Sequence, residues 1–96
     1  MASLADLASM KLAAVAQRGS KKDFIDVWAL ADHGFSLERM LAFYQQKYDT
    51  EDISHLVTSL SYFDDADPEP MPSMFVEIEW SAVKAELRRR VKAFAD

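Results

Sequence analysis

Two cations and two carboxylates are the residues of this chain whose types and spacing best fit chemistry. Lys11 and Arg18 lie two helical turns apart, on the arc where an amphipathic helix should carry apolar residues. Asp23 and Asp26 follow shortly after a turn at Gly19. A cation on a core-facing arc must be paired, or must extend its charged head to water, because an unpaired buried charge is costly. The sequence therefore predicts that the acids neutralise the cations across a helical hairpin.

Two roles are open to this cluster. In the first role it is a salt-bridge cluster that locks the hairpin. In the second role Lys11 and Arg18 form a cationic wall that faces a phosphate-bearing ligand, and the acids hold the cations in place. On the helical projection Asp23 lies beside the position of Val27, whereas Asp26 lies further toward the outside. This placement favours Asp23 as the inward acid.

The sequence predicts no metal site and establishes no catalytic residue. The chain has no cysteine, and His33 and His55 belong to different expected helices. The acids at positions 65, 67 and 69 imitate the start of an EF-hand loop, but Pro70 stands where that loop requires glycine. Nucleotidyltransferases hold metal ions with two carboxylates two positions apart on a strand, whereas Asp23 and Asp26 are three apart on an expected helix.

A small set of helices must position these residues. Apolar spacing predicts helices over residues 3–18 and 21–33, and the turns at Gly19 and Gly34 should end them. A third helix should begin after Ser36 and a fourth at Thr50, and a last helix should span residues 81–95. We therefore expect a single all-α domain over residues 1–96, a compact bundle of about five helices.

One loop should interrupt the bundle. Residues 62–73 hold all three prolines and four acids, so they cannot continue a helix. Tyr62, Phe63 and Met71 are expected to anchor this loop to the core. Residues 74–79 alternate in part and could form a short strand or an extended run. No partner strand is evident, so no substantial sheet is expected.

The composition and charge of the chain indicate which partners and which cellular compartment to expect. A net charge of −5 argues against general affinity for nucleic acid. The absence of cysteine fits a reducing compartment, and no apolar run is long enough to span a membrane, so a cytoplasmic protein is expected. Acids concentrate over residues 64–79 and cations over residues 84–92. These either neutralise one another on a solvated face, or the last helix binds a polyanion or partner.

The run DLASMKLAAVAQRGSKKDFIDVWAL resembles a late segment of the AbiEii/AbiGii-type nucleotidyltransferase toxin family. The family pattern of K-x-x-A, then Arg, then a basic residue followed by D-x-x-D is met by Lys11, Ala14, Arg18, Lys22, Asp23 and Asp26. The later runs LSYFDDADPEPMP and WSAVK look like the tail of one branch of this family. The earlier core of a family enzyme, with its Gly-Ser turn and Asp-x-Asp strand, has no counterpart in this sequence.

The resemblance implies that Lys11, with Asp23 or Asp26, faces the cleft of a complete enzyme. Lys11 would contact nucleotide phosphates there, while Arg18 and the acids support it. Mg²⁺ and a nucleoside triphosphate are implied for the complete enzyme and no cofactor for this chain alone.

The expected function is that of a toxin-type module that is catalytically incomplete alone, whether truncated, excised or half of a split protein. Its expected partner is a separate catalytic chain or another copy of itself. The alternatives are a regulatory protein that docks onto a separate nucleotidyltransferase or toxin chain, and a small active enzyme.

Overall fold

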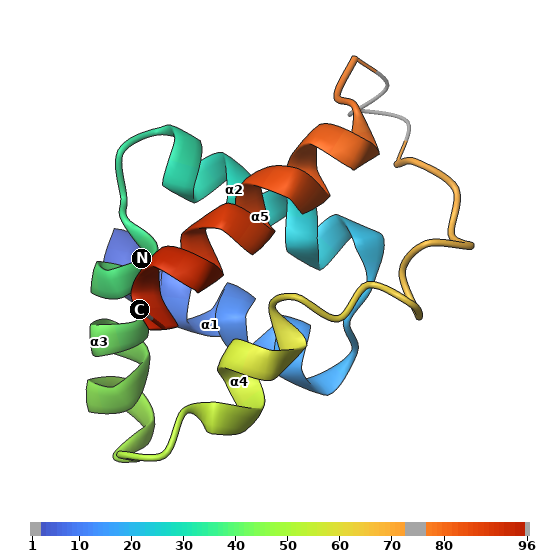
Figure 1. The fold of residues 1–96 in the computed structure, drawn as a ribbon. Helices are drawn as coiled ribbons and strands as arrows, with labels where there is room; N and C mark the ends of the chain where they lie inside the picture. Colours follow the sequence, from blue (N-terminus) through green and yellow to red (C-terminus); the bar gives the residue numbers. More distant parts are fainter. Residues whose placement is uncertain (1–2, 73–76, 96) are drawn as a thin grey trace.

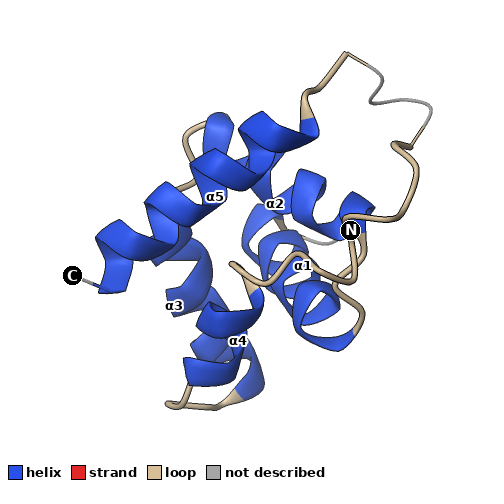
Figure 2. Cartoon of the chain, turned by 45° about the vertical axis from the view of Figure 1, so that its right-hand side comes forward, coloured by secondary structure: helices blue, strands red, loops and turns tan. Residues whose placement is uncertain are grey.

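Five helices carry the fold in the computed structural model, which describes residues 3–72 and 77–95. They are α1 (Leu4–Gln17), α2 (Lys21–Asp32), α3 (Leu37–Tyr48), α4 (Ser54–Ser59) and α5 (Trp80–Ala95). Helix α1 packs against α2, α3 and α4, and α5 lies across α2 and α3 (Figure 1). The described ranges contain no strand (Figure 2), so the all-α prediction is confirmed.

Serine side chains begin the first three helices. Ser3, Ser20 and Ser36 each accept a hydrogen bond from the backbone N–H three residues later, which satisfies a donor that the helix leaves free. Gly19 then has a φ of +60°, a left-handed conformation that favours glycine. The chain turns there and α2 returns along α1. Local signals of this kind are the reason that the sequence located these helices well.

Helix α4 begins later than the sequence predicted. The expected start was Thr50, but the helix begins at Ser54. Asp49 adopts a left-handed conformation (φ 49°) at the end of α3, and the Thr50 hydroxyl then donates to the carbonyl oxygen of Asp52 at 3.3 Å. The Asp52 carboxylate accepts from the backbone N–H of Ser54 at 3.0 Å. These local hydrogen bonds stabilise a turn over residues 50–53, and this turn replaces the predicted first turn of the helix.

The core lies where one apolar face of each helix meets the others. The largest fully buried apolar side chains are Leu12, Phe24, Ile25, Val27, Met40, Leu41, Leu60, Val83 and Leu87. Each buried side chain of this size contributes about 1.5–3 kcal/mol relative to exposure. Charged groups are therefore restricted to the ends and outer arcs of the helices, unless a partner accompanies them.

The acidic loop is anchored differently from the prediction. Phe63 is buried, and its ring centroid lies 4.9 Å from that of Phe24 and 5.7 Å from that of Trp80. Met71 packs partly against the core, but Tyr62 is 52% exposed, so its predicted anchoring role is wrong. The short strand or extended run expected over residues 74–79 falls partly outside the described residues, and residues 77 and 78 form a turn and a bend.

A polar cluster ties this loop to the starts of α2 and α5. Lys21 is buried, and its amine donates to the carbonyl oxygens of Glu69 (2.5 Å) and Asp67 (3.4 Å). The Glu69 carboxylate accepts from the backbone N–H of Lys21 at 2.5 Å. The Asp67 carboxylate accepts from the indole of Trp80 (2.8 Å) and from Lys84 (3.1 Å). Asp67 is thus paired with a cation of α5, and Glu69 is bound by the first turn of α2.

Replacing Asp67 by Asn should lower stability in a pH-dependent way. Hydrogen bonds from Trp80 and then Lys84 lower the pKa of Asp67 below its ordinary value of 3.8. A carboxyl group with a lowered pKa stabilises the fold above its unfolded pKa and loses that effect as pH falls through its folded value. Asp67→Asn should therefore have a lower urea midpoint than the wild type at pH 7, and the difference should shrink below pH 3.8.

The urea midpoint is read from tryptophan fluorescence, and Asp65→Asn is the matched control. Asp65 belongs to the same loop but has no ion-pair partner within the described part of the chain. A constant difference between Asp67→Asn and the wild type from pH 7 to the acid limit would contradict the role of the Asp67 charge.

Candidate functional site

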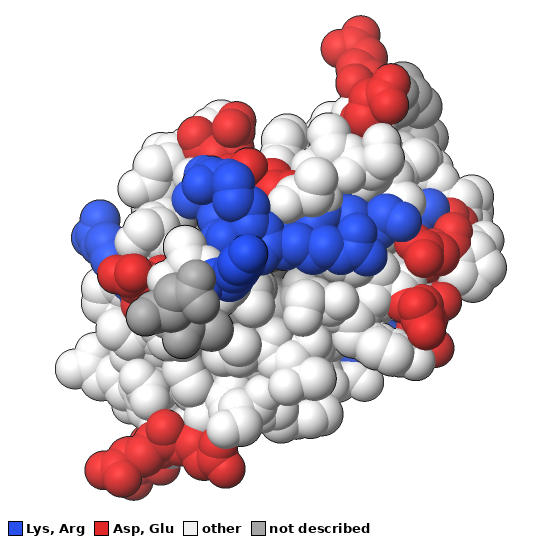
Figure 3. All heavy atoms as spheres, in the orientation of Figure 1, with Lys and Arg blue, Asp and Glu red and all other residues white. Residues whose placement is uncertain are grey.

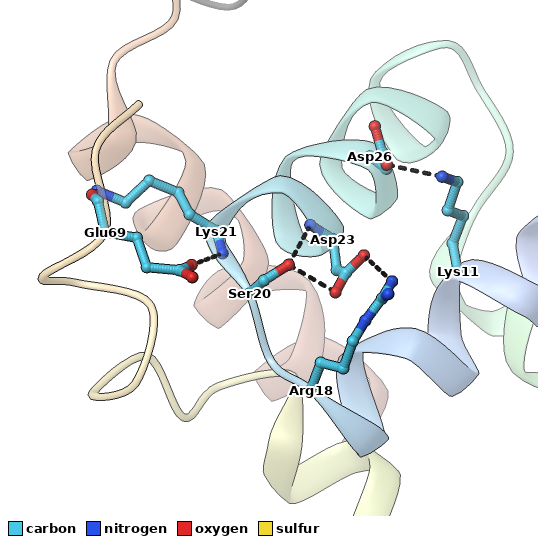
Figure 4. A network of polar contacts seen from close by, with 7 residues as sticks. All are labelled: Lys11, Arg18, Ser20, Lys21, Asp23, Asp26 and Glu69. Carbon is cyan, nitrogen blue, oxygen red and sulfur yellow. Dashed lines mark hydrogen bonds and ion pairs between the residues drawn. The ribbon is translucent and has the colours of Figure 1, made fainter. Parts of the chain in front are cut away.

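Two ion pairs join α1 to α2 across the hairpin. The amine of Lys11 lies 2.8 Å from Oδ2 of Asp26, and Nη2 of Arg18 lies 3.0 Å from Oδ1 of Asp23 (Figure 4). Both acids project from α2 toward α1, on successive turns. The structure thus pairs all four candidate residues, each cation with a different acid.

Asp23 is the inward acid, with a side chain only 4% exposed. Its Oδ2 accepts from the hydroxyl of Ser20 at 2.7 Å, while the backbone N–H of Asp23 donates to the same hydroxyl at 3.4 Å. Arg18 completes the set of donors around this carboxylate. A buried carboxylate is tolerated when donors of this kind surround it. Asp23 is therefore primarily a structural acid at the start of α2.

Arg18 does not point inward as the sequence predicted. Its side chain is 68% exposed and reaches Asp23 from the solvent side. Arg18 is the C-cap of α1, so its side chain leaves the helix at its end rather than from the packed arc. Arg18 also lines a separate cavity of ≈ 220 Å³ with His55, Ser59 and Asp65. Arg18 and Lys11 therefore do not form one cationic wall.

Lys11 opens into a pocket of its own. This cavity of ≈ 190 Å³ is lined by Leu7, Lys11, Asp26, Ala29, Leu30 and His33. The Lys11 side chain is 29% exposed and that of Asp26 is 18% exposed, so the pair lies at the boundary between core and solvent. An ammonium group has three donors and Asp26 takes one, so donors remain for an anion in this pocket.

Exposed apolar side chains lie on the same helix as Lys11, and one of them, Leu7, lines the pocket. Leu4, Leu7 and Met10 project from α1 with exposed fractions of 53%, 39% and 51%. Large apolar side chains grouped on one helix face are typical of a surface that contacts another protein or domain. Leu4 and Leu7 continue the apolar arc of α1, and other described residues cover them only in part.

Metal binding has little support in this arrangement. Within residues 3–72 and 77–95, no three His, Asp or Glu side chains come together in a way that could hold a metal ion. His33 lines the Lys11 pocket and His55 lines the Arg18 cavity, so the two histidines belong to different places. Among the residues that line the Lys11 pocket, Asp26 carries a carboxylate, and it is already paired with Lys11. What this site offers a ligand is a positive charge beside an apolar surface.

Comparison with known protein families identifies the family of the chain. The family model described as nucleotidyl transferase AbiEii toxin, type IV TA system, matches residues 1–96. The chain belongs to the AbiEii nucleotidyl transferase toxin family. The family resemblance read from Lys11, Arg18, Asp23 and Asp26 is thereby confirmed.

An uncharacterised protein of Aquifex aeolicus (strain VF5) is 41% identical to this AbiEii-family chain over 92 residues. The match covers 95% of the chain and 44% of the relative, so the chain spans less than half the length of the protein it matches. No solved structure matches the chain. No helix in the described ranges is long and apolar enough to cross a membrane.

Replacing Lys11 by Met should test its structural role. The variant leaves Asp26 half-buried and unpaired, and we expect a loss of about 1–2 kcal/mol, between the values for exposed and buried pairs. The double variant Lys11→Met/Asp26→Leu should recover most of this loss, because apolar side chains replace the ion pair. Urea unfolding gives each free energy.

Lys47→Met is the control for Lys11→Met. Lys47 pairs with Asp6 at 3.5 Å in an exposed position, so its loss should cost below about 1 kcal/mol. Equal losses for the two single variants would show that the Lys11–Asp26 pair adds nothing beyond an exposed ion pair.

Proposed function

We propose that this chain forms the helical wall of a nucleotide cleft in an AbiEii-type nucleotidyltransferase and is catalytically incomplete alone. In this proposal Lys11 binds the phosphates of a nucleoside triphosphate and Asp26 holds the amine in place. The carboxylates that bind Mg²⁺ come from another domain or chain. Membership of the family supports the general activity, and the Lys11 pocket supports the role of this part of the chain.

The observation that carries the proposal is the incomplete burial of Lys11. An ion pair made only for stability has no need of a pocket, yet both Lys11 and Asp26 line one of ≈ 190 Å³. Asp26 fixes the amine at 2.8 Å and leaves its other donors free. A lysine positioned in this way can bind a phosphate without first giving up its partner.

The exposed apolar face beside the pocket supports a neighbouring catalytic domain. Leu4, Leu7 and Met10 lie on the same helix as Lys11, so a domain that packs on them meets the pocket. The Aquifex relative is more than twice as long as the matched segment, which leaves room for such a domain in that protein. A nucleotide held between the two parts would be shielded from water.

Docking onto a separate chain is the second candidate. The same three exposed side chains could receive a catalytic chain in trans, in which case this protein completes or regulates its partner. Mg²⁺ finds no suitable set of ligands among the described residues, so neither candidate assigns a metal-dependent step to them. Within the cleft, these residues bind and orient phosphates.

Mixing the chain with a nucleotidyltransferase core tests the proposal. The purified chain is incubated with Mg²⁺ and labelled nucleoside triphosphates, first alone and then with the product of the neighbouring upstream gene. We expect label transfer to RNA or protein only in the mixture. Transfer by the chain alone would show that it is a complete enzyme and would refute the proposal.

The double variant separates the binding role of Lys11 from its structural role. Lys11→Met/Asp26→Leu should be nearly as stable as the wild type, but it lacks the phosphate ligand. We expect kcat/KM in the mixture to fall by about 10- to 100-fold, because a charge-assisted contact to phosphate contributes roughly 1.5–3 kcal/mol. Lys47→Met should retain full activity. A stable double variant with unchanged kcat/KM would leave Lys11 with a structural role alone.

A further inference from the structure

Positive charge is concentrated on α5 in a chain that is negative overall. The net charge of the protein is −5, yet α5 carries five of its 11 Lys and Arg residues and a single carboxylate. In the space-filling view, Lys and Arg atoms form a continuous band over α5, and Asp and Glu atoms lie near both ends of the band (Figure 3). This concentration of charge lies on a different helix from Lys11.

Part of this charge is neutralised within α5 itself. Glu86 accepts from Arg89 (Nε, 3.0 Å) and from Arg90 (Nε, 2.8 Å). These bonds lower the pKa of Glu86, with the Arg89 hydrogen bond as the largest cause. Arg89 and Arg90 therefore have an internal partner, and the remaining cations of α5 define the surface that is open to other molecules.

Lys84, Arg88 and Lys92 form a row along the outer face of α5. They are four residues apart, so the helix places them on one side at intervals of about 6 Å. Lys84 binds the Asp67 carboxylate at 3.1 Å. Arg88 and Lys92 are exposed, and no carboxylate within residues 3–72 and 77–95 forms an ion pair with either. The row begins with a bound carboxylate and continues with two accessible cations.

Arg88 is held in position by an aromatic ring. Its guanidinium carbon lies 5.0 Å from the centroid of Phe63, a buried side chain that the Arg88 head covers. A stacked guanidinium keeps its N–H edges directed outward and loses less freedom when it binds a planar carboxylate. Ala85 and Ser81, beside the row on α5, are small and exposed, which leaves room on that side for an approaching segment.

We propose that the row Lys84, Arg88 and Lys92 is a docking surface for a short acidic segment of a partner protein. Acidic side chains at alternate positions of an extended segment recur at about 7 Å, close to the spacing of the row. Asp67 on Lys84 shows that this surface binds a carboxylate. The acidic side chains of a bound segment would pair with Arg88 and Lys92, beside the carboxylate of Asp67 on Lys84.

Nucleic acid fits this surface less well. The row spans only about 12 Å along the helix, and a longer polyanion would meet the acidic loop at the Lys84 end. Strands bound without sequence preference also use exposed aromatic rings for stacking, whereas Phe63 is 2% exposed and lies under Arg88. The net charge of −5 further disfavours a long polyanion.

An NMR titration with two probes tests the docking surface. The probes are a short peptide with Glu at alternate positions and an oligouridylate RNA of equal charge, each added to the ¹⁵N-labelled chain at low salt and at about 0.15 M salt. We expect the peptide to bind more tightly than the RNA, with signal changes concentrated on α5. Tighter RNA binding, or peptide-induced changes elsewhere, would overturn the proposal.

Charge reversal identifies the cations that bind. Arg88→Glu and Lys92→Glu should each raise the peptide Kd by about tenfold, since each replaces an attraction by a repulsion. Arg39→Glu is the matched control, because Arg39 also stacks on a phenylalanine, Phe35 at 5.0 Å, but lies on α3. Arg88→Glu could fail to fold because it removes the contact with Phe63. Lys92 has no such contact among the described residues, so Lys92→Glu still tests the surface in that case. If Lys92→Glu and Arg39→Glu raised the peptide Kd equally, the peptide would be responding only to net charge. That result would reject the row as a site.

Discussion

The α1–α2 hairpin depends on a carboxylate that water hardly reaches. The Asp23 side chain is 4% exposed. Its carboxylate is bound by the Arg18 guanidinium and the Ser20 hydroxyl, both within 3.0 Å. Loss of those donors would leave a buried charge unpaired, which is among the most costly local defects in a protein. The turn at Gly19 is therefore fixed from both sides. Because α2 is rigid, Asp26 then lies one turn further along, where it meets Lys11.

The two ion pairs of the hairpin therefore differ in role, although both join a cation of α1 or its C-cap to an acid of α2. The Arg18–Asp23 pair sets the register of the hairpin, and its acid is buried with every donor assigned. The Lys11–Asp26 pair is held by that register and lies beside a pocket. Rigid support behind a partly exposed polar group is the usual way to keep a binding residue in place. Of the two roles considered from the sequence, the hairpin lock describes the Arg18–Asp23 pair, and the phosphate-facing cation is the role proposed for Lys11.

Local patterns explain what the sequence predicted correctly. Serine caps, glycine stops and apolar periodicity each act within a few residues, and they located α1, α2, α3 and α5 closely. The pairing of cations with acids followed from the short turn between them. The sequence misplaced Tyr62 and Arg18, because the direction of a side chain at the end of an element depends on what covers it. Thr50 failed as a helix start since Asp52 offered a competing turn.

The burial of Lys21 was not predicted from the sequence, for a related reason. Its side chain joins the start of α2 to the acidic loop. Nothing near Lys21 in the sequence indicates burial; its carbonyl partners come from Asp67 and Glu69, and the Trp80 ring lies 5.1 Å from its amine. The first turn of α2 is therefore held by α1 through Asp23 and by the acidic loop through Lys21. Neither contact can shift without moving α2. The Lys11 pocket and the row on α5 are consequently linked through α2, which packs against both α1 and α5.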